Sequence, residues 1–328
     1  MDRSSRHGKT WASVGIVACT AVYLFNAPWL APAIAGSPRL LAHRGVHQDF
    51  DRIGLASDGC TATRIREPIA PEIENTIGSM RAAFELGAEV VELDVHPTTD
   101  GQFAVFHDWT LDCRTEGTGR ARDHTMAYLK TLDVGFGYTA DGGRSFPLRG
   151  KGVGLIPSFD DVVAAFPGKH FLVNFKSHDP AEGELFAAAL NANQAWRAAV
   201  WAVYGGQQPT KRALQRSQGL KGFTRASEKR CLLGYLLLGW AGYVPEACRN
   251  TIVLVPQNYK HWLWGWPNRF LSRMSAVGTE VVLRGPYGEP GMPDGIDTVE
   301  QAALVPRGFP GLVWTNEIAR VAPLVTKP

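Results

Sequence analysis

Short apolar runs, rich in β-branched and aromatic residues, recur along the chain from residue 39 to its end. Most of these runs are continuous rather than alternating with polar residues, which is typical of strands buried on both faces. Helix-like segments separate several of them. The expected strands are residues 39–43, 89–95, 103–107, 170–176, 199–204, 221–224, 251–256, 279–283 and 311–315, and the expected helices are residues 75–86, 158–166, 180–191, 209–217 and 267–276.

This alternation of strands and helices predicts an α/β fold with a parallel sheet, most simply a (β/α)8 TIM barrel formed by residues 36–328. The pattern offers one strand more than such a barrel needs, so one run is an extra element or a misassignment. The weakest strands are 221–224 and 251–256. Residues 48–71 and 112–156 are long, polar stretches, and we expect them as loop insertions over the barrel mouth, because long irregular segments usually serve function.

The amino terminus has the pattern of an export segment. Residues 1–10 are polar and basic, residues 11–25 are almost wholly apolar, and a small-residue Ala33-Ile34-Ala35 site follows. Residues 1–35 are therefore expected to be a signal peptide or a retained N-terminal membrane anchor, and a buried helix is the third alternative. Both main alternatives predict a periplasmic or extracellular protein, anchored through residues 11–35 if the segment is kept.

The cysteines agree with export. Cys19 lies in the apolar run, which leaves Cys60, Cys113, Cys231 and Cys248 in the exported part. An even number of cysteines in an oxidising compartment permits disulfides, whose pairing the sequence leaves open. No cysteine or histidine spacing indicates a zinc site.

The charge balance argues against one class of partner. The chain has 34 Lys and Arg against 31 Asp and Glu, a formal net charge of +3, which does not favour nucleic acid. The tryptophan-rich segment 259–270 either contacts a membrane surface or packs a loop onto the barrel. The apolar run 231–240 is too short to span a bilayer and is expected to pack within the protein.

Polar side chains cluster at the ends of the first strands. Parallel barrel strands gather their carboxyl ends around one pocket, so residues that are distant in the sequence would meet there. Two of the clusters have i, i+2 spacing, which turns both side chains to the same face of a strand. The clusters are His43 and Arg44, Glu92 and Asp94, His107 and Asp108, and Asn174 and Lys176.

These residue types indicate phosphate chemistry. Two carboxylates in an apolar run need a compensating partner, and with an amide oxygen they suit Ca²⁺ or Mg²⁺. The alternative is a structural pair, Glu92 and Asp94, held by Arg44 or Lys176. Two histidines suit general acid–base catalysis, and an arginine with a lysine suits a phosphate oxyanion. The combination predicts metal-assisted hydrolysis of a phosphate ester.

At these residues the chain resembles the glycerophosphodiester phosphodiesterase family. The matching stretches are LLAHRG at 40–45, ENT at 74–76, GAEVVELDVHPTTDGQFAVFHD at 87–108 and FLVNFKS at 171–177. The resemblance covers residues 39–180 closely and the remainder loosely. It implies a (β/α)8 barrel that cleaves phosphodiesters with the help of a divalent cation.

The resemblance also implies roles for individual residues. His43 and His107 would be the acid–base pair, Arg44 and Lys176 the phosphate contacts, and Glu92, Asp94 and Asn174 the metal ligands, with Glu74 beside them. Apart from the resemblance, His96 lies two residues after Asp94, so it turns to the same strand face and is a further candidate for the site. Family members commonly have glutamate where this chain has Asn174, so we expect weaker cation binding or a carboxylate recruited from elsewhere. The family's carboxy-terminal Thr-Asp pair has its counterpart in Thr315-Asn316.

Three functions remain open. The first is hydrolysis of glycerophosphodiesters to glycerol 3-phosphate and an alcohol. The second is a lysophospholipase D-like enzyme of the same barrel family, acting on a lysolipid, with a cyclic phosphate as an intermediate or product. The third is a non-catalytic exported binding protein. The sequence does not decide the lipid head group, the metal identity, which histidine is the acid or the oligomeric state.

Overall fold

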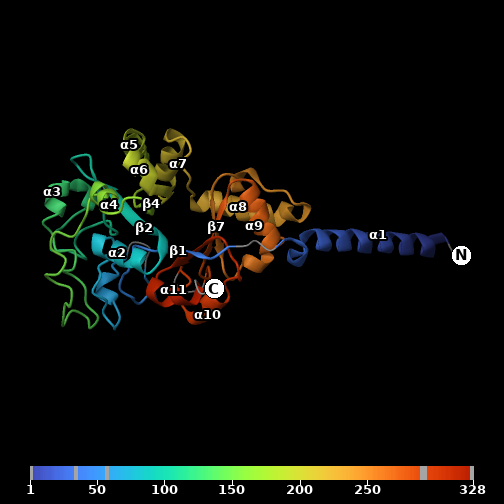
Figure 1. Cartoon of the computed structure of the whole chain (residues 1–328), viewed down its shortest axis with the longest axis horizontal. Helices are drawn as coiled ribbons and strands as arrows, with labels where there is room; N and C mark the ends of the chain where they lie inside the picture. Colours follow the sequence, from blue (N-terminus) through green and yellow to red (C-terminus); the bar gives the residue numbers. More distant parts are fainter. Residues whose placement is uncertain (1–2, 33–35, 56–58, 289–293, 326–328) are drawn as a thin grey trace.

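A computed structural model describes residues 3–32, 36–55, 59–288 and 294–325, and it contains one curled sheet wrapped by helices (Figure 1). The strands are β1 (Arg39–Ala42), β2 (Ala88–Pro97), β3 (Phe103–Val105), β4 (His170–Phe175), β5 (Val200–Gly205), β6 (Ile252–Pro256), β7 (Glu280–Arg284) and β8 (Leu312–Thr315). Their order is β5-β4-β2-β1-β8-β7-β6, with every one of these neighbours parallel. The predicted parallel α/β barrel is confirmed.

The gap between β5 and β6 is filled by residues 221–223, from one of the two weakest expected strands. The backbone of Val203 exchanges hydrogen bonds with Lys221 at 3.1 Å and Phe223 at 3.2 Å. On the other side, Thr251 Oγ1 donates to the carbonyl oxygen of Gly222 at 2.8 Å. Residues 221–223 therefore complete the barrel as a single bridge rather than as a full strand.

The surplus strand is β3. It pairs with the end of β2 in the antiparallel direction, so the expectation that residues 103–107 form a stave of the parallel barrel is wrong. Asp100 and Gly101 make the tight turn between the two strands, and Gly101 has a φ of +78°, which glycine adopts without strain. An Asp-Gly pair between two apolar runs is a hairpin signal.

The helices lie outside the sheet, and the five expected ones are confirmed to within a few residues. They are α1 (Arg3–Asn26), α2 (Ile77–Glu85), α3 (Met126–Leu129), α4 (Phe159–Ala165), α5 (Pro180–Ala192), α6 (Gln194–Ala199), α7 (Gln207–Arg216), α8 (Arg225–Leu238), α9 (Asn268–Ala276), α10 (Val299–Ala303) and α11 (Ile318–Val325). Several begin at side chains that cap the helix, such as Thr76 before α2 and Ser158 before α4.

The core has an inner and an outer layer, as the strand pattern requires. Leu41, Leu172 and Leu254 belong to a cluster inside the barrel, whereas Leu40 and Val173 belong to the cluster between the sheet and the helices. Each strand is thus buried on both faces, which explains the continuous apolar runs.

The two polar insertions pack together around a core of their own. Ile65 and Leu148 are among its buried members. The Cys60–Cys113 disulfide joins the two insertions, and Cys231–Cys248 joins α8 to the 3₁₀ turn η5 (Glu246–Cys248). This second core occupies the side of the molecule that carries α3, at the opposite end from α1 (Figure 1).

The apolar segments near the carboxyl half divide in their exposure. In the tryptophan-rich segment, Trp266 is buried and packs on Phe270, Trp264 donates to the carbonyl oxygen of Leu236, and Trp262 is exposed. Among the residues that the structure describes, no helix is both long and apolar enough to cross a bilayer.

Candidate active site

The expected site residues converge at the carboxyl ends of β1, β2 and β4, together with the segments that follow β1 and β3. Glu92 and Asp94 are fully buried, and the side chains of Arg44 and Lys176 above them are 11% and 18% exposed. The side chain of His43 is 17% exposed. The cations and this histidine can therefore meet a ligand from solvent, while the carboxylates lie beneath them.

Asp94 is the centre of the cluster and is surrounded by donors. Its Oδ1 accepts from Asn174 Nδ2 at 2.8 Å and lies 3.6 Å from Lys176 Nζ. Its Oδ2 accepts from Asn75 Nδ2 at 2.9 Å and lies 3.4 Å from Arg44 Nε. Burial opposes ionisation of Asp94, but Lys176, His107 and Arg44 outweigh it and lower its pKa, so it is a carboxylate.

Asn75 is a site residue that the sequence analysis passed over. It lies within the ENT stretch, where only Glu74 was singled out, and it holds both the side chain and the backbone of Asp94, accepting from the Asp94 amide at 3.1 Å. Its φ is +60°, a left-handed conformation that asparagine tolerates better than most residues. The matched motif was the available signal for this role.

Glu92 has different hydrogen-bond partners from Asp94, and its pKa shifts in the opposite direction. Tyr204 donates to its Oε1 at 2.7 Å, and the backbone amide of Arg44 donates to its Oε2 at 3.1 Å. Burial and the neighbouring Asp94 raise the pKa of Glu92. Arg44 reaches this position with a φ of +57°, followed by Gly45 at +78°, a turn that directs its backbone amide at Glu92.

The third expected metal ligand presents the wrong atom. Asn174 turns its Nδ2 toward Asp94. Its Oδ1 packs against Gly205 so closely that a Cβ at position 205 would lie only 2.0 Å from this oxygen. Within the described residues, no group of three or more His, Cys, Asp or Glu side chains is arranged to hold a metal ion. Glu92, Asp94 and Asn174 supply oxygen ligands that fit a hard cation only if the Asn174 amide reverses.

Glu74 is not free to act as a substitute ligand. Its Oε1 pairs with Arg44 at 3.1 Å and with Arg114 at 3.0 Å, and Tyr138 donates to its Oε2 at 3.3 Å. Burial opposes its ionisation, but the two arginines dominate and lower its pKa to about 2. Glu74 is therefore ionised, and its two oxygens are engaged by Arg44, Arg114 and Tyr138.

His43 is oriented by two residues in succession, Asn316 directly after β8 and Asp297 behind it. Its Nδ1 lies 2.6 Å from Asn316 Oδ1, and Asn316 Nδ2 donates to Asp297 at 2.7 Å. Because the amide oxygen can only accept, His43 carries its proton on Nδ1 and keeps the lone pair on Nε2, which faces Glu92 at 3.7 Å. Burial and Arg44 lower the pKa of His43 well below its usual range, so the ring is neutral.

His107 is oriented by a carboxylate instead. Its Nδ1 lies 2.5 Å from Asp108 Oδ1, and Arg114 Nε donates to the other Asp108 oxygen at 2.8 Å. Burial, Arg44 and Lys176 lower the pKa of His107 well below its usual range. Arg114 comes from the insertion 112–156, which was expected over the barrel mouth, and its side chain is 1% exposed.

His96 lies beside the site without a charged role. It is fully buried next to the ring of Trp109, with 5.8 Å between the ring centroids. Burial and Lys176 lower its pKa to about 4, so it is neutral at physiological pH.

Three further residues contact the site although no sequence feature predicted them. They are Asp297, Arg114 and Tyr204.

The chain is also similar to known proteins in sequence. The model of the glycerophosphoryl diester phosphodiesterase family matches residues 43–222. A glycerophosphodiester phosphodiesterase from Caldanaerobacter subterraneus subsp. tengcongensis is 40% identical over 105 residues, which are 31% of this chain and 39% of that relative's length. The chain thus aligns with less than half of that protein.

Solved structures share the fold at low sequence identity. A glycerophosphoryl diester phosphodiesterase domain from Mycobacterium tuberculosis has a TM-score of 0.61 at 17% identity, covering 88% of this chain and 98% of that one. A phosphodiesterase from Oleispira antarctica, solved with the product sn-glycerol-3-phosphate, has a TM-score of 0.55 at 19% identity, covering 89% and 98%.

Proposed function

Because the chain belongs to the glycerophosphoryl diester phosphodiesterase family, we propose that it hydrolyses glycerophosphodiesters to glycerol 3-phosphate and an alcohol. The observation that carries this proposal is a pair of histidines, each held through Nδ1 by an acceptor, next to Arg44 and Lys176. The Oleispira antarctica phosphodiesterase was solved with sn-glycerol-3-phosphate, which is the product that this proposal expects here.

Arg44 and Lys176 are the proposed phosphate contacts. They approach the two oxygens of Asp94 from different sides and are among the more exposed groups of the cluster. A phosphodiester monoanion over this pair would gain charge-assisted hydrogen bonds. Glu74 fixes the guanidinium of Arg44 through Nη1, which limits the side-chain entropy lost on binding.

The partners of the two histidines support different roles for them. The base accepts the proton of the attacking hydroxyl, either water or the adjacent hydroxyl of the substrate's glycerol group, and His43 Nε2 is the available lone pair. The acid must carry a proton to the leaving oxygen. Burial, Arg44 and Lys176 lower the pKa of His107 until a bound phosphate anion offsets the charge of the two cations, and the carboxylate of Asp108 then favours an imidazolium at His107 more than the amide of Asn316 does at His43. His43 is thus the proposed base and His107 the proposed acid.

Family members typically use a divalent cation, and Glu92, Asp94 and a reversed Asn174 amide are the proposed ligands for Ca²⁺ or Mg²⁺. When bound, such a cation supplies positive charge to the phosphate oxygens. In the arrangement described here, Arg44 and Lys176 already neutralise Asp94, so the cation competes with them and we expect it to bind weakly.

A lysophospholipase D-like activity is the second candidate. It shares every catalytic residue named above and differs in the substrate, a lysolipid. Exposed Trp262 and Tyr259, on the segment that follows β6, favour an apolar substrate chain or a membrane surface nearby.

The two disulfides support export of the folded domain, because disulfides form and persist in oxidising compartments.

The test is hydrolysis of glycerophosphocholine and lysophosphatidylcholine by the full chain with Ca²⁺, with Mg²⁺ and with EDTA. Turnover that falls at least about 100-fold in His43→Ala and in His107→Ala supports the phosphodiesterase. His170→Ala, at the exposed start of β4, is the matched control and keeps wild-type turnover. Absence of turnover on both substrates would favour the binding-protein alternative.

A further inference from the structure

The end of α1 is built into the barrel rather than lying loosely on it. Asn26 and Ala27 are buried, and Asn26 Nδ2 donates to the carbonyl oxygen of Trp240 at 2.8 Å. Arg273 of α9 donates to Asn26 Oδ1 at 2.9 Å, and Arg269 donates to the carbonyl oxygen of Ala27 at 3.3 Å. The segment expected to be a signal peptide or an anchor thus ends in a joint with its own hydrogen bonds.

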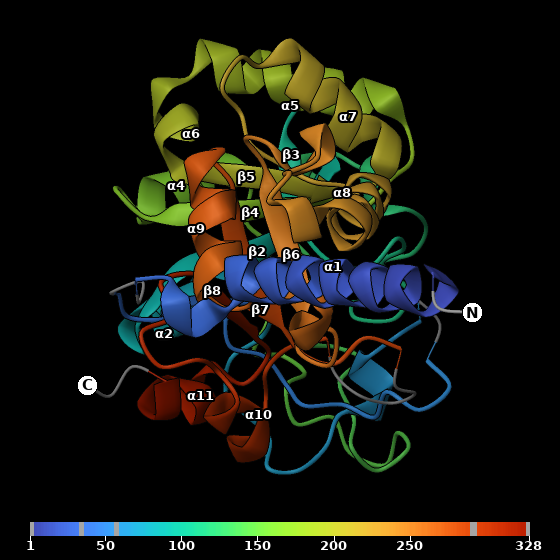
Figure 2. The ribbon, with the colours of Figure 1, turned by 90° about the vertical axis from the view of Figure 1, so that its right-hand side faces the viewer.

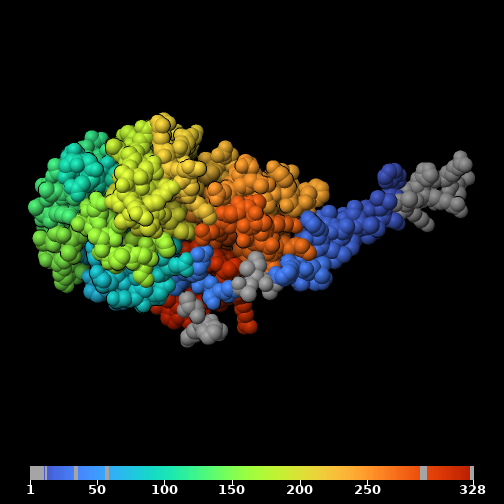
Figure 3. All heavy atoms as spheres, turned by 45° about the horizontal axis from the view of Figure 1, so that its top comes forward, coloured from blue at the N-terminus to red at the C-terminus, as the bar shows by residue number. Residues whose placement is uncertain are grey.

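Beyond this joint, α1 stands clear of the molecule (Figures 1 and 3). Its apolar side chains face solvent, with Trp11 76% exposed and Val17 68% exposed. The exposed large apolar residues of the helix are Trp11, Val14, Ile16, Val17, Tyr23, Leu24 and Phe25. Contiguous exposed apolar surface of this kind marks an interaction site.

The neighbouring part of the barrel is also apolar on its outside. The 3₁₀ turn η4 (Gly239–Ala241) follows α8 directly and touches the joint, where Phe25 lies against Gly242. In this region Leu237 is 73% exposed, and the other exposed apolar residues are Leu233, Leu238, Trp240 and Tyr243. Figure 2 views the molecule from this side, with α1 in front of α8 and α9.

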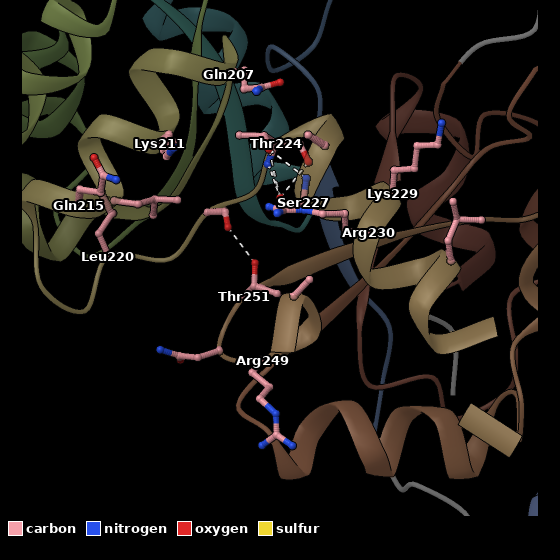
Figure 4. A pocket seen from close by; sticks show the side chains of 16 residues that line it. Gln207, Lys211, Gln215, Leu220, Thr224, Ser227, Lys229, Arg230, Arg249 and Thr251 are labelled. Atoms are coloured by element: carbon pink, nitrogen blue, oxygen red, sulfur yellow. Dashed lines mark hydrogen bonds between the residues drawn. The ribbon is translucent and has the colours of Figure 1, made fainter. Parts of the chain in front are cut away.

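A basic hollow continues this surface. Between α7 and α8 lies a cavity of about 1040 Å³ whose lining includes Lys211, Lys229, Arg230 and Arg249 but no acidic residue (Figure 4). Leu233 lines the same hollow, so the apolar surface of α8 runs into it. Arg249 Nε pairs with Glu246 Oε2 at 3.3 Å, and Glu246 itself does not line the hollow.

We propose that α1, the exposed apolar residues of α8 and η4, and the basic hollow together bind the surface of an anionic lipid bilayer, with α1 retained as an anchor. An apolar face bordered by lysine and arginine suits a lipid surface, since apolar side chains enter the acyl boundary while the cations meet anionic head groups. A protein partner would need acidic groups to match the hollow. The binding is interfacial and is independent of the proposed hydrolysis.

The test uses the full chain in co-sedimentation with vesicles of phosphatidylcholine alone and with 30% phosphatidylglycerol (about one anionic lipid in three). Wild type binds the anionic vesicles at least about tenfold more tightly, and high salt removes the difference. Lys229→Gln with Arg230→Gln lowers that affinity about fivefold per charge. Leu237→Asp with Leu238→Asp lowers binding to both kinds of vesicle at least about tenfold.

Matched controls lie away from this surface. Lys151→Gln, in the insertion near α3, and Leu185→Asp, on α5, leave vesicle binding within about twofold. All four variants keep wild-type hydrolysis of soluble glycerophosphocholine, so loss of lipid binding is distinguishable from loss of the proposed activity. Binding that ignores lipid charge, a lipid-free dimer that does not bind vesicles, or an intact mass that begins near residue 36 overturns the proposal.

Discussion

Asn316 accepts a hydrogen bond from His43 Nδ1 at 2.6 Å, and this bond decides which nitrogen of the proposed base carries the lone pair. Asp297, 3% exposed, fixes this amide by accepting hydrogen bonds from both the backbone nitrogen and the side-chain nitrogen of Asn316. Asn316 is thus a positioning residue for His43.

Replacing Asn316 by leucine removes the acceptor, so the imidazole loses its fixed tautomer. We expect kcat to fall about 10- to 100-fold with KM nearly unchanged. Asn316→Asp supplies a negative partner that favours the imidazolium, which raises the pKa of His43 and moves the acid limb of the kcat/KM profile to higher pH. Asn258→Asp, at an exposed loop position, is the control; an equal shift there would contradict the assignment.

Asn174→Glu should strengthen cation binding. It restores a third carboxylate beside Glu92 and Asp94, and we expect the affinity for Ca²⁺ or Mg²⁺ to rise at least about tenfold. Calorimetric titration of the full chain without substrate measures this directly. Asn174→Gln keeps the neutral amide as the matched control, and equal affinities in all three proteins would mean that position 174 is not a ligand.

Removing the Cys60–Cys113 disulfide should affect catalysis as well as stability. It closes a segment of 53 residues in sequence separation, which chain-entropy reasoning values at about 4 kcal/mol. Cys113 precedes Arg114, which holds both Asp108 and Glu74, so we expect Cys60→Ser with Cys113→Ser to lower kcat too. Cys231→Ser with Cys248→Ser, distant from these contacts, should lower the unfolding free energy while kcat stays near wild type.

Glu182 on α5 should make the protein less stable as pH rises. Burial raises its pKa to about 7, so the folded state holds a proton that the unfolded chain releases near pH 4.5. The unfolding free energy therefore falls between about pH 4.5 and 7, by at most about 3 kcal/mol from this group, and then levels off.

Glu182→Gln should remove that part of the pH dependence and raise stability at pH 8 while changing little at pH 4.5. Urea unfolding at the two pH values measures it. Glu85→Gln, at an exposed position of α2, is the control. Glu228, whose pKa burial also raises to about 7, leaves a second dependence of the same sign in the variant. A Glu182→Gln protein with wild-type stability at both pH values would contradict this prediction.

Local sequence patterns determined most of the fold. Continuous apolar runs require strands buried on both faces, and each such run became a strand or a bridge of one sheet. The antiparallel direction of β3 was not predicted, because a continuous apolar run does not indicate whether its strand is parallel or antiparallel to its neighbour. The tight turn at Asp100 and Gly101 sets that direction. Residues 221–223 are recognised as part of the barrel only through their hydrogen bonds to Val203 on one side and Thr251 on the other.

In the candidate site, spacing along the chain was enough to predict the relationships between residues that are close in sequence. The i, i+2 spacing placed Glu92 with Asp94 and Asn174 with Lys176 on common strand faces, because strand side chains alternate. How these groups act on one another depends on the three-dimensional packing. Asp297 reaches His43 through Asn316 across the sheet, Arg114 arrives from an insertion, and the amide of Asn174 turns its nitrogen to Asp94. Charge states and donor directions depend on neighbours in space, which spacing along the chain does not encode.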